Sequence, residues 1–251
     1  MINKKNFKEK FDYFILIILS FFVNFYYSSL GVLPQDTFAY YDTGYRVLNG
    51  AVPFKDYWTV SGPFIDYFQA ILFSLFSVRW KTYIINGSII NSIITIIFYF
   101  TLNTFNQNKF LNLFYSVCFC ILANPSMGVP FPAHYSTFLS LMGIFFFLVA
   151  IREDKIFFWL FIPIFYFLAF FSKQSPASYL LIPIIIASVL YISFYKKLNF
   201  IKYFAVSSLF CVIFLITLFY LNQIDIFQFL NQYILFPQTI AEYRIKNYQF
   251  N

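Results

Sequence analysis

Charged residues, glycine, histidine and cysteine are all scarce in this sequence. Of its 251 residues only 11% are Asp, Glu, Lys or Arg and 7 are glycine, whereas 61% are apolar and the mean hydropathy is +0.71. A soluble domain has roughly a quarter of its residues charged. The composition therefore excludes an ordinary soluble domain and predicts an integral membrane protein.

The small number of cysteines, and a single histidine, exclude the common metal and redox sites. Cys118, Cys120 and Cys211 lie inside apolar runs, and their spacing matches no cysteine metal motif. An odd number of cysteines in such runs is typical of small core residues. We expect neither disulfide bridges nor cysteine metal ligands.

The net charge of +7 does not predict a nucleic-acid partner. Lys4, Lys5, Lys8 and Lys10 cluster just before the first apolar run. In that position a basic cluster favours contact with anionic lipid and a cytoplasmic N-terminus. The run 14–33 has about the ~20 residues that a bilayer needs and lacks a clear small-residue cleavage site, so we expect a retained first span.

Apolar runs separated by Pro, Asn or charge clusters continue along the chain. They predict an all-α protein, a polytopic transmembrane helical bundle with about seven or eight membrane segments. Residues 1–251 are expected to form a single membrane domain with no separate soluble domain. The expected helices are 12–33, 63–78, 83–103, 110–124, 133–150, 156–171, 177–195 and 201–221.

Strict alternation of these segments conflicts with the distribution of positive charge. With a cytoplasmic N-terminus it puts Lys196, Lys197 and Lys202 outside, against the positive-inside tendency. The segments 63–78 and 110–124 are short for a span, so we expect that one of them does not cross. The loop at 125–134, the turn around Lys173 and the tail after Leu221 then share the outer side with the loop 34–62.

The loop 34–62 is the longest polar stretch of the chain. Phe38, Tyr41, Tyr45 and Leu48 recur at helical spacing over 37–49 and predict an amphipathic helix on the membrane surface, ended by “NG”. On the other flank Asp42 and Arg46 are four residues apart and can pair across one helical turn. A solvated pair of this kind is an ordinary structural feature, and the loop aromatics also suit a headgroup-level belt.

Asp36 stands at the start of this helix, after Pro34. A carboxylate there can cap free backbone N–H groups, which is its commonest role. The loop nevertheless continues with more charge and two prolines through “GAVPFKDYWTVSGPF”. A plain connector does not need so much ordered polar sequence.

Three stretches of the chain carry a pattern: “QDTFAY”, “VLNGAVPFKDYW” and “SGPFIDYFQAILFSLF”. A first span, Asp-x-x-x-Tyr, a surface helix, a Pro-Phe-Lys-Asp-aromatic segment and a Gly-Pro re-entry resemble the polytopic type C glycosyltransferases. These enzymes use polyprenyl-phosphate sugars and include protein O-mannosyltransferases and lipid A aminoarabinose transferases. Weaker echoes occur in “NPSMGVPFPAHYSTFLSLMGIFFFLVAIRED” and “FLAFFSKQSPASYLLIPII”, so the resemblance covers roughly residues 10–190.

The resemblance implies inverting transfer of a sugar from a polyprenyl-phosphate donor to a hydroxyl of a protein, lipid or glycan acceptor. It implies an integral protein of the bacterial inner membrane that acts on the outer face. A base must accept the hydroxyl proton, and a cation must hold the leaving phosphate. Asp36 matches the carboxylate of the family's loop and is the predicted catalytic base.

Further residues are expected to contact substrate or a cation. No cofactor is certain, but if a divalent cation takes part, Asp36 is its expected ligand, and oxygen ligands favour magnesium or manganese. Lys55, Arg46 and Lys173 are candidates for the leaving phosphate; a Lys at membrane depth needs such a partner or snorkels to the headgroups. Loop, helix-start and turn residues complete the expected substrate-binding set: Tyr40, Asp56, His134 and Gln174.

The chain also departs from this family. Family members are usually about twice as long, and the aminoarabinose relatives have a Lys beside the re-entry proline, where this chain has Ser61 and Gly62. A truncated, non-catalytic relative is therefore an alternative. A transporter or lipid flippase is another, although its ionisable groups would lie inside the spans, whereas here the charges gather in loops.

Overall fold

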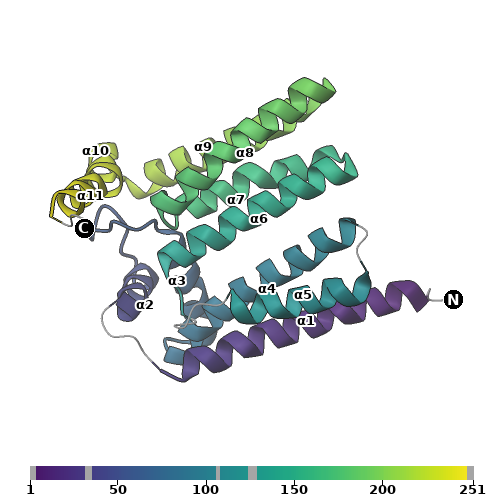
Figure 1. Ribbon diagram of the computed structural model, residues 1–251. Helices are drawn as coiled ribbons and strands as arrows, with labels where there is room; N and C mark the ends of the chain where they lie inside the picture. The colour runs from purple at the N-terminus through teal and green to yellow at the C-terminus, as the bar shows by residue number, and fades with distance from the viewer. Residues whose placement is uncertain (1–3, 32–35, 106–107, 124–128, 248–251) are drawn as a thin grey trace.

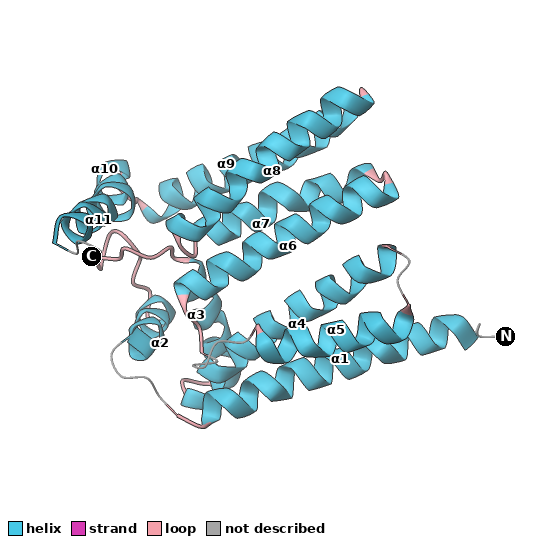
Figure 2. Ribbon diagram, viewed as in Figure 1, coloured by secondary structure: helices cyan, strands magenta, loops and turns pink. Residues whose placement is uncertain are grey.

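The structure is a computed structural model that describes residues 4–31, 36–105, 108–123 and 129–247. Throughout these residues it is built from helices joined by turns (Figure 2). Five of the described helices are long and apolar enough to cross a membrane. They are α1 (Lys4–Ser29), α4 (Trp80–Thr104), α6 (Pro132–Glu153), α8 (Gln174–Tyr195) and α9 (Asn199–Asn222). The predicted all-helical architecture is confirmed.

The expected count of seven or eight membrane segments is not confirmed, because the remaining apolar helices are short. They are α3 (Phe64–Phe76), α5 (Lys109–Leu122) and the 3-10 helix η1 (Ile156–Leu160), which continues into α7 (Phe161–Phe170). The sequence predicted helices in these regions, but an apolar run does not reveal by itself whether its helix is long enough to span.

The helices form two packed groups that meet along α4 and α6 (Figure 1). One group contains α1, α4 and α5, and the other contains α6, α7, α8 and α9. The N-terminus lies at one end of the bundle, which we call the N-terminal end. The opposite end carries α2 (Asp36–Leu48), the segment 49–63, α3 and the chain after α9, and we call it the loop end.

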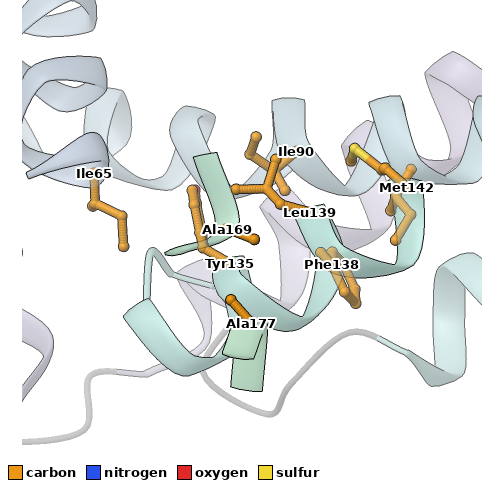
Figure 3. Packing of buried hydrophobic residues seen from close by; sticks show 9 residues of the cluster. Ile65, Ile90, Tyr135, Phe138, Leu139, Met142, Ala169 and Ala177 are labelled. Carbon is orange, nitrogen blue, oxygen red and sulfur yellow. The ribbon is translucent and has the colours of Figure 1, made fainter. Parts of the chain in front are cut away.

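The core lies between α4 and α6, as Figure 3 shows. Ile90 of α4 packs with Leu139 and Met142 of α6, and Ile65 of α3 closes the loop end of the same cluster. The scattered Asn and Ser of the apolar runs line the α1–α4 contact instead: Ser20 bonds the Ser92 hydroxyl at 3.1 Å. Side-chain hydrogen bonds and small residues hold helices together where lipid removes the hydrophobic drive.

Helix α2 packs on α3 through a close backbone contact that the apolar stripe did not indicate. Gly44 is buried, and a Cβ there would lie 2.6 Å from Cγ of Gln69, whereas the predicted face residues Phe38 and Tyr45 are exposed. Tyr41 of the same stripe packs edge-to-face on Phe73 of α3, with ring centroids 5.0 Å apart. The predicted helix is present, and its position on the membrane surface stays a prediction.

Three helical segments follow α9 that the sequence did not predict. They are α10 (Ile226–Phe229), the π-helix η2 (Leu230–Leu235) and α11 (Phe236–Asn247). Asp225 caps α10 by accepting the N–H of Phe227 at 3.0 Å. The three segments fold against the loop end (Figure 1).

Candidate functional site

The “SGPF” re-entry is fastened to the turn between α7 and α8. The N–H of Gly62 donates to the Ser172 carbonyl at 3.0 Å, and the N–H of Phe64 donates to the Phe171 carbonyl at 3.0 Å. A Cβ on residue 62 would lie 1.8 Å from the oxygen of Phe171. Only glycine permits this backbone contact, which accounts for the Gly-Pro pair that opens α3.

The chain after α9 packs on the same loop and forms hydrogen bonds with it; we call this set of contacts the clasp. The buried Gln232 amide donates to the Phe54 carbonyl at 2.9 Å, and its oxygen accepts the N–H of Thr59 at 3.1 Å. Tyr233 donates to the Phe170 carbonyl, and Phe54 and Tyr233 share an aromatic cluster with Phe171 and Phe229. Sequence patterns did not reveal this clasp, because its polar contacts go mostly to backbone atoms.

An apolar cleft of about 390 Å³ lies among the first loop, α3, α7 and α9. Of its lining residues, Phe54 and Phe171 are buried, while Ile71 (55% exposed) and Phe214 (46% exposed) are exposed. The residues that line it are Pro53, Phe54, Pro63, Phe64, Tyr67, Phe68, Ile71, Phe167, Leu168, Phe171, Phe214, Leu215, Leu218, Phe219 and Ile224. The apolar lining suits a lipid-like chain.

A polar cleft of about 340 Å³ adjoins it. Its lining residues come from the first loop and from α10 and η2: Lys55, Asp56, Tyr57, Trp58, Gln228, Asn231 and Gln232. The first loop thus lines the apolar cleft with residues 53–54 and the polar cleft with residues 55–58. The lining therefore changes from apolar to polar between residues 54 and 55.

Lys55 lies where the two clefts meet. Its Nζ donates to the Asn222 carbonyl at 3.2 Å, at the end of α9 and close in sequence to Ile224, which lines the apolar cleft. The Asp56 carboxylate accepts the N–H of Val52 at 2.7 Å and so closes the tight turn. Both side chains are exposed, so a cation and a carboxylate face solvent side by side.

A buried carboxylate that sequence reasoning missed lies beneath this turn. Asp66 of α3 is 1% exposed and accepts hydrogen bonds from Thr43 Oγ1 at 2.5 Å and from the Tyr57 hydroxyl at 2.8 Å. Burial raises the pKa of Asp66 to about 6, although both hydrogen bonds oppose the shift. Burial and the charge of Asp66 also raise the pKa of Tyr57. An ionisable residue within an apolar run was the available signal.

The polar contacts of α3 continue into the bundle. Gln69 accepts a hydrogen bond from Asn86 Nδ2 at 2.8 Å, and Asn86 in turn accepts the Tyr135 hydroxyl at 2.5 Å. Gln69 and Asn86 are fully buried, and Tyr135 is nearly so. This chain of side chains links α3, α4 and α6 and fixes the position of Asp66 relative to the core.

The predicted residues of α2 lie in two different places. Asp36 begins α2, but its side chain lies outside the described residues. Tyr40, one turn later, is 3.0 Å from the Ser61 hydroxyl, so this face of α2 meets the re-entry. Arg46 pairs with Asp42 at 2.7 Å on the exposed face, as predicted, and contributes to neither cleft.

About 18 Å of helix axis separates Asp36 from Leu48, because a helix rises about 1.5 Å per residue. Lys55 comes after the Leu48 end of α2, within the segment 49–63. Among the described side chains the carboxylate beside Lys55 in the polar cleft is Asp56.

The remaining predicted residues support the site from its far side. His134 is half-buried in the first turn of α6, with its ring centroid 3.9 Å from that of Phe138, rather than in a loop. Gln174 donates to the Val60 carbonyl at 3.2 Å and also to the Tyr233 carbonyl. Lys173 precedes α8, and its carbonyl accepts the Ser136 hydroxyl at 2.8 Å. Gln174 therefore joins the loop and the tail.

Metal-binding groups do not cluster in the described part of the chain. Within it no three His, Cys, Asp or Glu side chains come together as a metal site would require. The Asp36 side chain, the predicted ligand, is outside that part. A role for magnesium or manganese therefore stays a prediction.

Comparison of this chain with protein-family models, with curated proteins and with solved structures found no match.

Proposed function

We propose that this protein is a membrane glycosyltransferase that moves a sugar from a polyprenyl-phosphate donor to a hydroxyl acceptor at the loop end. One observation carries the proposal: the apolar cleft and the polar cleft meet on consecutive residues, with Lys55 between them. A lipid-phosphate sugar changes from apolar to polar at its phosphate in the same way. The resemblance of the first loop to polyprenyl-phosphate-dependent enzymes points to the same donor.

The two parts of the donor make different contributions to binding. Moving a polyprenyl tail from lipid into the apolar cleft gains little, because lipid chains are as apolar as the cleft lining. The cleft therefore orients the tail, and the affinity comes from the headgroup. A hydrogen bond from Lys55 to the phosphate contributes roughly 1.5–3 kcal/mol, as bonds to charged groups do.

The transfer step needs a base at the acceptor hydroxyl. The base accepts the hydroxyl proton, the acceptor oxygen bonds to the anomeric carbon with inversion, and the phosphate leaves with the electron pair of the broken C–O bond. The resemblance assigns this role to Asp36. Asp56 lies beside Lys55 in the polar cleft and is the competing assignment. If a divalent cation is used, it binds at Asp36.

Seven crossings and an outer loop end fit the distribution of charge. We count the five long helices together with α5 and η1–α7, and leave α3 at the loop end. Ten of the 17 Lys and Arg then belong to the N-terminal end, among them Lys4, Lys5, Lys196 and Lys197. The positive-inside tendency favours a cytoplasmic N-terminal end, in the inner membrane of a bacterium.

Cysteine labelling in intact cells tests this orientation. In a background without native cysteines, Cys at position 55 is expected to react with an impermeant maleimide, and Cys at position 196 is expected to react only after permeabilisation. Both residues are exposed, so accessibility within the fold is matched. The reverse pattern would contradict the proposal.

Transfer from synthetic polyprenyl-phosphate sugars in reconstituted vesicles tests the activity. Lys55→Ala is expected to raise the donor KM by about 10- to 100-fold, from the energy of one charged hydrogen bond. Lys109→Ala, at the N-terminal end, is the matched control. Asp36→Asn and Asp56→Asn identify the base: the variant that abolishes turnover while donor binding persists has lost it.

Other outcomes of this assay identify the alternatives. Movement of the donor across the bilayer without transfer would favour a flippase. Donor binding with neither movement nor transfer would favour a non-catalytic relative. If the donor does not bind at all and Lys55→Ala changes nothing, the proposal is wrong.

A further inference from the structure

The polar cleft points to the chemical class of the acceptor. We infer that it binds a saccharide, which presents the hydroxyl that receives the new sugar. This inference rests on the proposed function for the transfer itself, but the binding can be measured separately. Four features of the cleft carry it: an exposed indole, two exposed amides, balanced charge and lining residues that follow directly on those of the apolar cleft.

Trp58 provides an apolar platform that is open to solvent. Its side chain is 58% exposed and packs edge-to-face on Phe236, with ring centroids 5.3 Å apart and planes at 85°. The other tryptophans are used inside the fold, since Trp159 is fully buried and Trp80 packs on Tyr83. A pyranose ring has a C–H face that packs on an aromatic surface of this kind.

Two amide side chains from α10 and η2 also line the cleft. Gln228 and Asn231 are three residues apart where α10 passes into η2, so they project from the same side, and both are exposed. Each amide offers both donors and acceptors, which matches sugar hydroxyls that donate and accept. The neighbouring amide of Gln232 is already committed to the loop.

The charges in the cleft favour a neutral acceptor over an anionic one. Lys55 and Asp56 are adjacent, so the cleft contains one cation and one anion. With Lys55 bound to the donor phosphate, an anionic acceptor would be repelled by Asp56, whereas a hydroxyl of a neutral polyol can donate a hydrogen bond to that carboxylate. A tryptophan that served only as a headgroup-level anchor would not need this arrangement of amides and charges.

The position of the cleft fits an acceptor and not the donor lipid. Lys55 belongs to the polar cleft and bonds at the end of α9, where the apolar cleft begins. A saccharide on Trp58 therefore presents its hydroxyls beside the phosphate of a bound donor. The acceptor oxygen then attacks the anomeric carbon on the face opposite the phosphate, which leaves with the electron pair of the broken C–O bond.

Calorimetric titration of the protein in lipid nanodiscs with neutral oligosaccharides tests the inference. Sugar-headed detergents must be avoided because they would compete. The titrants are gluco-, manno- and galacto-oligosaccharides, with an unglycosylated Ser/Thr peptide as the other acceptor class. Wild type is expected to bind at least one saccharide saturably and not the peptide. Trp58→Ala is expected to weaken this binding about tenfold, the loss of one aromatic contact.

Phe227→Ala is the matched control, because Phe227 is 71% exposed on α10 but does not line the cleft. It is expected to leave saccharide binding unchanged. Asn231→Ala is expected to weaken binding without loss of fold, and Trp58→Phe to retain part of it, so a misfolded Trp58→Ala would still leave two informative variants.

Saccharide binding without any transfer would refute the proposed function and leave this inference standing. Transfer whose acceptor KM is the same in wild type and Trp58→Ala, binding of the peptide instead, or no saturable saccharide binding would each overturn it.

Discussion

Replacement of Asp66 by Asn tests whether the buried carboxylate is held at an energetic cost. Asparagine has nearly the same shape and no charge. Its oxygen can accept one of the two hydroxyl hydrogen bonds, and its amide can donate to the other hydroxyl, of Thr43 or Tyr57, which rotates to accept. The substitution therefore removes the ionisation and keeps the packing.

The size of the effect follows from the pKa of Asp66. The pKa rises from 3.8 to about 6, which corresponds to about 3 kcal/mol against the ionised form in the folded protein. Because the folded value is the higher one, the folded state binds the proton more tightly than the unfolded chain. The contribution of Asp66 to stability is greatest below pH 3.8, falls as the pH rises toward about 6, and stays lower above it.

Unfolding midpoints of wild type and Asp66→Asn, measured in detergent from about pH 4 to about pH 8, provide the test. The advantage of the Asn variant over wild type is expected to grow by up to about 3 kcal/mol across this range. The acidic end is the internal control, since wild type is then protonated and also neutral. A difference between the two proteins that does not change with pH would show that Asp66 ionises without cost and would refute the reasoning.

Three further substitutions test contacts at the loop end. Gly62→Ala is expected to lower the folded yield sharply because its Cβ would lie 1.8 Å from the Phe171 oxygen, whereas Gly31→Ala, with nothing within 4 Å, is expected to be neutral; equal yields by size-exclusion chromatography would disprove the contact. Gln232→Ala removes two hydrogen bonds and is expected to speed hydrogen exchange in residues 53–60, and unchanged exchange there would contradict the clasp. Arg46→Ala breaks an exposed ion pair and is expected to lower the free energy of unfolding by under about 1 kcal/mol and to leave transfer activity unchanged. A large loss of transfer would restore Arg46 as a substrate contact.

The long apolar helices could be predicted from the sequence because their signal is local. A run such as 83–103 predicts its own helix, and the structure extends it only to Trp80–Thr104. The pair Asp42–Arg46 was predictable for the same reason, since helical spacing alone brings the two residues together. The helices after α9 were not predicted, because their polar residues interrupt the apolar runs from which the other helices were predicted.

The site was harder to predict because it is assembled from distant segments. Lys55 and Asp56 were named from the first loop, but Gln228 and Asn231, which face them, have no recognisable motif. Asp66 was overlooked because its partners Thr43 and Tyr57 come from a helix and a loop that pack on it only in the folded chain. A sequence shows which residues are chemically able to act, and packing decides which of them meet.

The seam between Gly62 and the α7–α8 turn also sets an order of events during biosynthesis. Ser172, the partner of Gly62, leaves the ribosome long after the first loop has done so, and Gln232 later still. Since chains fold from the N-terminus as they are made, the first loop must wait without its partners while α4 to α9 insert. Both clefts therefore take shape only after Ile224 and Gln232 have left the ribosome, so a nascent chain cannot engage substrate before these residues have been made.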